Sequence, residues 1–451
     1  MHRSPITPRR DIARDCVPEY SESGTRVGGT CKAPRMGSPR VRLRSWRGRG
    51  ALRCPMLLPM YPELNPFSPG SGLEPPTLAG RDAEIAAFDL LVARSRRQHL
   101  SPSMVLYGYR GVGKTVLLNA MRRHAGRMGW LCIDIEGQAS EVGAQAVRQR
   151  LGRQLHVAAD KFKNGKQYTD AVRRAFGTLT SFSISLGVVG LEVAREQPTG
   201  RASSGRLEVD LEELVEDFAP ALRESSSAIG IFIDEMQDVD DELLGALLTV
   251  QNRAGQQGIP FYVVGAGLPS LPALLGRTRS YAERLFDYWH VDALSESDAR
   301  KALETPFTDR NALIAPDALA LLLAESSGYP YYIQVFGHAT WNASSDKFVR
   351  LSAAQEAIRV GYARLEQGIF PSRWDRASAD EREFLRRMCD TADPTCTLSD
   401  IATRCSLTQV ELTTIRRSLV EKGMIYSLDP DTIAFTVPGM PRFIQRQDAD
   451  S

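Results

Sequence analysis

The chain has 451 residues, of which 43% are hydrophobic and 24% charged, and its formal net charge is +2. This is the composition of an ordinary folded protein with enough residues for two or three domains. No apolar run approaches the roughly 18 residues that a membrane-spanning helix needs, so we expect a cytoplasmic protein with no membrane partner.

The amino-terminal segment, residues 1–75, is rich in Arg, Pro, Gly and Ser and has no periodicity, which predicts a disordered tail. Residues 1–55 hold 13 basic and 4 acidic side chains, which leaves 43 basic and 50 acidic ones in the rest. The pI of 8.1 therefore belongs to the tail and does not indicate a folded part that binds nucleic acid. The tail is either a genuine basic segment or an over-extended start, and mass spectrometry of the amino-terminal peptide would decide between these.

A glycine-rich loop, GYRGVGKT, occupies residues 108–115 between an apolar run at 104–107 and a helical pattern that begins at Lys114. Its three glycines let the backbone bend so that successive N–H groups point at a polyphosphate, and the following helix adds its positive end. This order of strand, loop and helix predicts an ATP site in which Lys114 contacts the β and γ phosphates. The loop residues predicted to bind the nucleotide are Gly108, Tyr109, Arg110, Gly111, Val112, Gly113, Lys114, Thr115 and Val116.

Short apolar runs alternate with amphipathic helical patterns from residue 78 to residue 291. Such alternation predicts an α/β fold, here a P-loop, doubly wound parallel sheet. The runs lie near residues 104–107, 130–135, 229–233, 261–264 and 287–291.

The spacer between the second and third runs contains a strict alternation of apolar residues and serines. Phe182, Ile184 and Leu186 would face one side of a strand, and Gly187 with Gly190 would turn a hairpin. We expect this hairpin either to form a partner surface or to cover the sheet.

The apolar run at 229–233 ends in two acids, Asp234 and Glu235. It has the character of a central parallel strand that is buried on both faces, and acids at the end of such a strand meet a ligand crevice. We expect Asp234 to hold Mg²⁺ together with the Thr115 hydroxyl, and Glu235 to orient or deprotonate the attacking water. The plainer alternative is a solvated acidic turn, since more acids follow at 238–242.

With both motifs in view, the chain resembles the AAA+ superfamily and its signal-transducing STAND relatives, near the origin-recognition and archaeal ATPase branches. LAGRDAEI, residues 78–85, resembles the family segment that touches the adenine, which implies contacts from Gly80 and Arg81. GYPYYIQVFG, residues 328–337, resembles the Gly-x-Pro element of the lid, which implies that Pro330 packs near the base. The alternative for this second element is a capped helix start with its aromatic residues in the core.

Two departures from the family pattern qualify the resemblance. FYVVGAGLPSLP, residues 261–272, resembles the fourth core strand and its sensor turn, but Gly265 and Ala266 stand where the family often has a polar side chain. Tyr331 stands where ring-forming members carry a lid arginine. The likeness therefore lies nearer to STAND or archaeal-type ATPases.

Arg284 precedes the last apolar run, at a place where many AAA+ proteins carry an arginine that reaches a neighbouring subunit's nucleotide. The resemblance implies a catalytic role for Arg284 in an assembly, because such an arginine neutralises charge in the transition state. The alternatives are a salt bridge to Glu283 or Asp287, or plain solvent exposure.

Three domains are expected after the tail: an ATPase core at 76–293, a helical lid at 294–370 capped by Ser295, and a different module at 371–451. In this module one helix, two further helical patterns and the strand-like TIAFTV follow in an order that resembles a winged helix-turn-helix.

The last module offers two interpretations. Its second helical pattern would bury Leu412, Ile415 and Leu419 and leave Gln409, Thr413, Arg416 and Arg417 facing outward, as in a DNA-reading helix. However, residues 371–451 hold 11 basic and 13 acidic side chains, and neutralising phosphates requires positive charge. We therefore expect contact either with DNA or with the ATPase core or a protein partner.

Taken together, the motifs and the resemblance predict an ATP-binding and ATP-hydrolysing molecular switch that uses Mg²⁺ and turns over slowly until it assembles with itself or another protein. The γ phosphate and Mg²⁺ would hold core and lid together until hydrolysis releases them. The alternative is a non-catalytic regulator that keeps ATP as a structural ligand and binds DNA or protein.

Overall fold

The computed structural model describes residues 60–163, 170–188, 200–390, 395–405, 407–427, 430–437 and 439–449. The predicted tail lies outside these residues as far as residue 59.

A five-stranded parallel sheet is the centre of the first part of the fold, in the order β2-β3-β4-β1-β5. The predicted parallel sheet is confirmed, and each strand coincides with one of the five apolar runs. The strands are β1 (Ser103–Tyr107), β2 (Leu131–Glu136), β3 (Ile229–Asp234), β4 (Phe261–Gly267) and β5 (Phe286–His290).

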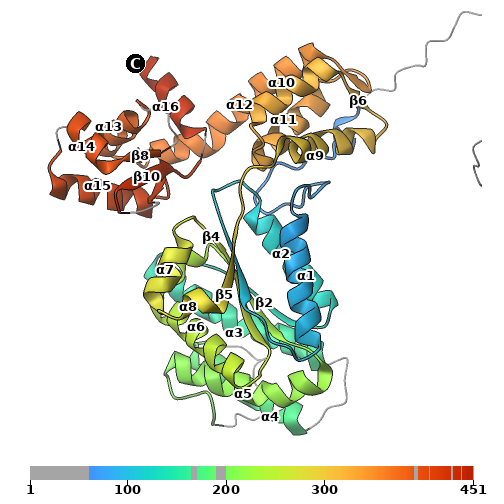
Figure 1. Cartoon of the computed structure of the whole chain (residues 1–451), viewed down its shortest axis with the longest axis vertical. Coiled ribbons are helices and arrows are strands. Elements are labelled where there is room, and N and C mark those ends of the chain that lie inside the picture. Colours follow the sequence, from blue (N-terminus) through green and yellow to red (C-terminus); the bar gives the residue numbers. More distant parts are fainter. Residues whose placement is uncertain are drawn as a thin grey trace, which may run out of the picture. The chain divides into compact units, whose positions relative to one another are not determined.

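Helices cover both faces of this sheet (Figure 1). Phe232 of β3 joins an apolar cluster with α1 and α2, whereas Ile231 and Ile233 join a second cluster with α3, α5 and α6. A strand that is buried on both faces needs apolar residues at successive positions, which is why β3 is a continuous apolar run. The elements are α1 (Asp82–Arg96), α2 (Lys114–Arg127), α3 (Glu141–Lys163), α4 (Asp170–Ser185), α5 (Leu207–Ser225), η3 (Met236–Asp238), α6 (Asp241–Gln256), α7 (Leu271–Thr278) and α8 (Ala282–Leu285).

The predicted hairpin in the spacer was wrong, because this stretch continues the helix α4. Phe176, Leu179 and Phe182 are all at most 3% exposed and recur every three residues, which is the spacing of one helix face. Ile184, which the hairpin would have placed beside Phe182, is 55% exposed. Gly190 lies outside the described residues.

Four helices follow the sheet in the stretch for which the sequence predicted a helical lid, and we call them the lid helices. The side chain of Ser295 caps the first of them by accepting a hydrogen bond from the Asp298 N–H at 3.2 Å. The last helix continues past residue 370, where we had expected the lid to end, and reaches Trp374. The elements are α9 (Glu296–Thr308), β6 (Leu313–Ile314), α10 (Pro316–Ser326), α11 (Pro330–Ala343), β7 (Phe348–Val349) and α12 (Leu351–Trp374).

Residues 60–75, which we had assigned to the disordered tail, pack against these lid helices instead. Phe67 is 2% exposed, and its ring lies 5.3 Å from that of Phe307. The Trp341 indole donates a hydrogen bond of 2.9 Å to the Tyr61 carbonyl, just before the short helix η1 (Pro62–Leu64). The prediction failed because it used composition alone. Composition does not show whether the aromatic residues of a segment find a surface to pack against.

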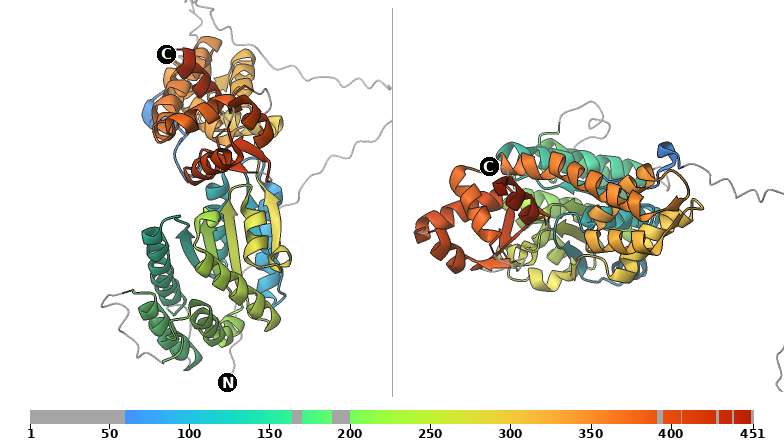
Figure 2. Two further views of the ribbon diagram at one scale, coloured as in Figure 1. Left: turned by 90° about the vertical axis from the view of Figure 1, so that its left-hand side faces the viewer. Right: turned by 90° about the horizontal axis from the view of Figure 1, so that it is seen from above.

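The carboxyl-terminal elements form a small unit of helices around a three-stranded antiparallel sheet of order β8-β10-β9. In Figures 1 and 2 this unit and the lid lie beyond the same edge of the parallel sheet. The elements are α13 (Ala379–Met388), β8 (Thr395–Thr397), α14 (Leu398–Cys405), α15 (Gln409–Glu421), β9 (Ile425–Ser427), β10 (Thr432–Phe435) and α16 (Met440–Ala449).

The helix α15 buries part of the stripe that we predicted for it. Leu412 and Leu419 are at most 2% exposed, while Ile415 is only half-buried. The predicted outward position of Arg416 is corrected, since its guanidinium donates to the Ser427 hydroxyl at 2.8 Å. Arg417 is exposed. None of the helices in the described ranges is long and apolar enough to cross a membrane.

The substitution Phe232→Ala tests the core. It removes a fully buried ring whose centroid lies 6.1 Å from that of Phe88. We expect the free energy of unfolding to fall by about 3–5 kcal/mol, because the strand cannot collapse into the space left behind. Denaturant titration measures this change. Val142→Ala, at a side chain that is 80% exposed, is the control and should change the free energy little.

Candidate functional site

The glycine-rich loop begins where β1 ends and leads directly into α2. A side-chain carbon at Gly108 would lie 2.0 Å from the Val291 carbonyl oxygen, so only glycine fits between β1 and the end of β5. Gly111 and Gly113 have φ values of +86° and +96°, in the left-handed region that other residues rarely adopt. The loop is therefore shaped by its glycines, as the sequence predicted.

Lys114 lies at the first position of α2 with its ammonium group turned into the loop. The ammonium donates to the carbonyl oxygens of Gly108 at 3.0 Å and Tyr109 at 2.7 Å, and the residue is 7% exposed. Burial lowers the pKa of Lys114 to about 8, while the nearby carboxylates of Glu235 and Asp234 act in the opposite direction. A desolvated cation at the first position of a helix suits an anionic ligand.

The two motifs meet through a hydrogen bond between their side chains. The Thr115 hydroxyl donates to the Asp234 carboxylate at 2.7 Å, although the two residues are 119 positions apart. Burial raises the pKa of Asp234, while the hydrogen bond from Thr115 acts against that rise. The structure thus brings together the two residues that we predicted to hold the metal.

A hydroxyl beside one carboxylate suits Mg²⁺, which keeps several waters and takes few protein ligands when a polyphosphate supplies others. No group of three or more His, Cys, Asp or Glu side chains within the described ranges could hold a metal ion by itself. Thr115 and Asp234 are therefore the residues that would hold Mg²⁺ here, together with oxygens of the nucleotide.

Glu235 follows Asp234 in a left-handed backbone conformation with φ of +45°. Such a conformation is uncommon outside glycine, and it turns the side chain away from the strand. One carboxylate oxygen accepts a hydrogen bond of 2.7 Å from the Gln237 amide, and the other lies 3.7 Å from the Arg110 guanidinium. Gln237 also accepts a hydrogen bond from the Leu268 N–H at 3.0 Å. Gln237 therefore links Glu235 to the end of β4, a role that the sequence did not reveal.

Arg81 connects the segment before α1 to the loop through hydrogen bonds of its guanidinium group. Its guanidinium donates to the carbonyl oxygens of Val112 at 3.0 Å and Asp292 at 2.6 Å, and the residue is 7% exposed. Burial lowers its pKa, with Glu84 acting in the opposite direction. Gly80, with φ of +66°, makes the bend that delivers Arg81 to this position.

The first turn of α11 contacts the glycine-rich loop from the lid side. The Tyr329 hydroxyl donates to the Arg110 carbonyl, and the Tyr331 N–H donates to the Gly111 carbonyl at 3.2 Å. Burial raises the pKa of Tyr329. Pro330 lies between these two tyrosines, so the Gly-x-Pro element lies against the loop, and the packing of Pro330 near the base stays a prediction.

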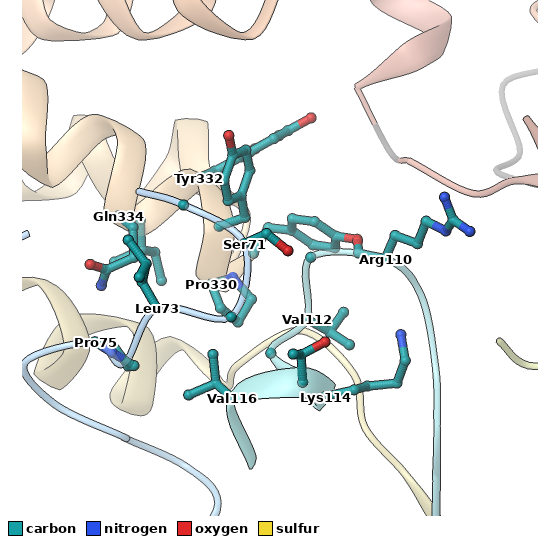
Figure 3. A pocket seen from close by; sticks show the side chains of 18 of the residues that line it. Ser71, Leu73, Pro75, Arg110, Val112, Lys114, Val116, Pro330, Tyr332 and Gln334 are labelled. Carbon is teal, nitrogen blue, oxygen red and sulfur yellow. The ribbon is translucent and has the colours of Figure 1, made fainter. Parts of the chain in front are cut away.

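A cavity of about 480 Å³ lies between the loop, the acids, the lid and a strap formed by residues 68–79. This volume is within the range of cofactor pockets. In Figure 3 the strap residues Ser71 and Leu73 lie beside Pro330, and the Arg110 side chain points away from Pro330. Eleven of the predicted site residues line the cavity: Arg81, Arg110, Gly111, Val112, Gly113, Lys114, Thr115, Val116, Asp234, Glu235 and Pro330.

The other four predicted site residues do not line it. The carbonyl oxygens of Gly108 and Tyr109 accept hydrogen bonds from Lys114, and Gly80 makes the backbone bend that positions Arg81. Arg284 is exposed on α8, and none of the described residues forms an ion pair with it. A salt bridge to Glu283 or Asp287 is therefore not formed, and a role toward a neighbouring subunit stays a prediction.

Several cavity residues carried no signal in the sequence. Tyr332 and Arg373 reach the cavity from α11 and from the end of α12, and Val437 reaches it from beyond β10. The strap had the Pro, Gly and Ser content of a linker. No motif connects these segments, because only the folded chain brings them to the loop.

Comparison with known proteins gives two matches to protein families. Residues 77–264 match the family described as AAA ATPase domain, and residues 367–444 match a domain of unknown function (DUF8462). None of the curated proteins matches the chain.

Solved structures resemble the chain at low sequence identity. A Walker-type ATPase of Pyrococcus abyssi is similar over 82% of this chain and 96% of its own, with 15% identity and a TM-score of 0.54. The Orc1 protein of Aeropyrum pernix, solved in complex with DNA, covers 84% and 94% with 16% identity and a TM-score of 0.42. Cdc6p from Pyrobaculum aerophilum covers 84% and 97% with 14% identity and a TM-score of 0.43. The first of these likenesses supports the fold.

The substitution Gly108→Ala tests the close approach of the loop to β5. The added carbon would lie 2.0 Å from a backbone oxygen that has no room to move, so we expect a loss of about 1–3 kcal/mol in the free energy of unfolding. Gly255→Ala in α6 is the control, since no atom lies within 4 Å of the added carbon there. The control should be neutral or stabilising by up to about 1 kcal/mol. Equal stability of the two variants would contradict the tight fit.

The lowered pKa of Lys114 predicts a dependence of stability on pH. Between pH 8 and 10.5 the folded protein has released this proton while the unfolded chain still holds it, so stability rises with pH. Across this window the free energy of unfolding of the wild type should rise by on the order of 1–3 kcal/mol relative to that of Lys114→Met. Denaturation at several pH values measures the difference, and a constant difference would show that the ammonium is not desolvated.

Proposed function

We propose that this chain, in which residues 77–264 form an AAA ATPase domain, binds ATP with Mg²⁺ and hydrolyses it as a molecular switch. The hydrogen bond of 2.7 Å between Thr115 and Asp234 carries this proposal. It puts the hydroxyl and the carboxylate that would hold the metal at one point, beside the buried ammonium of Lys114. These three groups line one cavity, as the binding of a metal-bridged triphosphate requires.

Each residue of the site then has a chemical task. Lys114 and the loop N–H groups bind the β and γ phosphates, for which Lys114 exchanges its hydrogen bonds to the Gly108 and Tyr109 carbonyls. Mg²⁺, when bound, supplies further positive charge to the phosphate oxygens. Glu235 orients the attacking water and accepts its proton while the bond between the γ phosphorus and the bridging oxygen breaks, which leaves ADP and phosphate.

Arg110 gives a reason for slow turnover in the isolated chain. Its guanidinium lies 3.7 Å from the Glu235 carboxylate, and both side chains are about 30% exposed. An attacking water must therefore compete with Arg110 for this carboxylate. A partner that draws Arg110 away would raise the rate.

The carboxyl-terminal unit is, in this proposal, a winged helix whose position depends on the nucleotide. The order of α13, β8, α14, α15, β9 and β10 supports this assignment. Its contact with the loop supports the coupling, because the rings of Tyr109 and Tyr426 lie 5.3 Å apart. We propose that the unit contacts DNA or a protein partner, and the excess of acidic over basic residues favours the protein partner.

A second candidate is a non-catalytic regulator that retains ATP as a structural ligand. The enclosure of the cavity by the strap and by α11 favours long retention of a nucleotide. A single-turnover assay with γ-labelled ATP separates the two candidates, since only the ATPase releases labelled phosphate.

Two substitutions test the ATPase directly. Lys114→Ala should abolish ATP binding, because it removes the cation that faces the phosphates. Glu235→Gln should keep ATP binding and lower turnover by about 10²-fold or more, because the amide accepts no proton. Equilibrium titration and phosphate release measure the two effects.

The matched control for Glu235 is Glu136→Gln. Glu136 ends β2, pairs in register with Asp234 and is exposed, so its substitution removes an acid from the same edge of the sheet. Turnover of this variant should equal that of the wild type. Equal turnover of Glu235→Gln and the wild type would show that Glu235 does not accept the proton of the attacking water.

A further inference from the structure

We propose that Arg373, at the end of α12, binds the terminal phosphate of the nucleotide and lets the carboxyl-terminal unit distinguish ATP from ADP. This inference rests on the proposed function, since it assigns a new residue to the same site. Nothing in the sequence around Arg373 forms a nucleotide motif. The assignment comes from the position, burial and missing charge partner of its side chain.

Arg373 lines the same cavity as Lys114 and the two acids, but it approaches from the other side. It belongs to the last turn of α12, which ends at Trp374, whereas Lys114 begins α2. Burial, together with the nearby Arg110, lowers the pKa of Arg373 to about 10, while Glu235 acts in the opposite direction. Its guanidinium therefore lies within the electrostatic field of both Arg110 and Glu235.

The charge of Arg373 is not compensated by the protein. Across the described ranges, none of the acidic side chains forms an ion pair with it, and its hydrogen bonds go to two neutral oxygens. These are the Gly423 carbonyl at 3.3 Å and the Thr436 hydroxyl at 3.1 Å, and both bonds use the same guanidinium nitrogen. A half-buried guanidinium without a partner is costly, and a phosphate that accepts its other N–H groups is the ligand that would offset the cost.

The terminal phosphate fits this position better than the others. Lys114 and the loop N–H groups take the phosphates next to α2, and Glu235 marks where water attacks the γ phosphorus. Arg373 and Arg110 both interact with Glu235, so they flank the same end of the polyphosphate. In ADP that end carries no phosphate, and Glu235 is then the anion that the two arginines share.

Arg373 also connects this end of the cavity to the carboxyl-terminal unit. Gly423 lies in the turn between α15 and β9, and Thr436 follows β10. The Thr436 hydroxyl donates to the Gly423 carbonyl at 2.7 Å, so Arg373 joins an existing contact between the two segments. Charge-assisted bonds to phosphate are stronger than bonds to neutral oxygens. A terminal phosphate would therefore compete with Gly423 and Thr436 for the guanidinium.

The test compares the affinities for a non-hydrolysable ATP analogue and for ADP, each with Mg²⁺, by titration calorimetry of the full chain. Arg373→Ala should weaken binding of the triphosphate by about tenfold or more and binding of ADP by less than about threefold. Arg373→Lys keeps a positive charge without the planar fork and should fall between the wild type and the alanine variant. If the alanine variant does not fold, Arg373→Lys still tests the assignment.

Arg376→Ala is the matched control, because Arg376 is an exposed arginine three residues further along the chain. Both affinities should stay within about threefold of the wild type. An Arg373 variant that loses both affinities equally, or keeps the wild-type ratio between them, would overturn the assignment while leaving the ATP site in place. A wild-type chain that binds neither nucleotide would overturn the proposed function as well.

Discussion

The hydrogen bond between Thr115 and Asp234 depends on a constraint in the strand that separates them. The strands β1 and β3 are not neighbours, because β4 lies between them. Two positions at the end of β4 have no side chain where the acidic turn approaches: a carbon at Gly265 would lie 2.2 Å from the Met236 sulfur, and one at Gly267 would lie 2.5 Å from the Gln237 amide oxygen. Gly265 and Gly267 therefore make room for the acidic turn.

The site is also a balance of buried charges. Arg81, Arg110, Lys114 and Arg373 supply four positive charges around the cavity, and Asp234 and Glu235 supply two negative ones. The two acids raise the pKa of Lys114 against the effect of burial, and Glu235 does the same for Arg373. A site with more positive than negative side chains in a partly desolvated space favours anionic ligands.

The parts of the molecule that the sequence predicted are those that local physics determines. The loop between β1 and α2 needs glycine for its own backbone angles, and strands buried on both faces need continuous apolar runs. The spacer misled us because its alternation covers only a few residues, whereas the buried face of the helix follows Phe176, Leu179 and Phe182. The strap and Arg373 could not be predicted, since Phe67 is ordered by Phe307 and Arg373 reaches the cavity only through the fold of the lid.

The length of α12 has a mechanical consequence. This helix spans 24 residues from the lid to the carboxyl-terminal unit without a break, which corresponds to about 36 Å. A rigid rod of that length turns a tilt of about 10° at one end into a displacement of about 6 Å at the other. A small rearrangement around α11 would thus produce a larger displacement at α15, as the proposed switch requires.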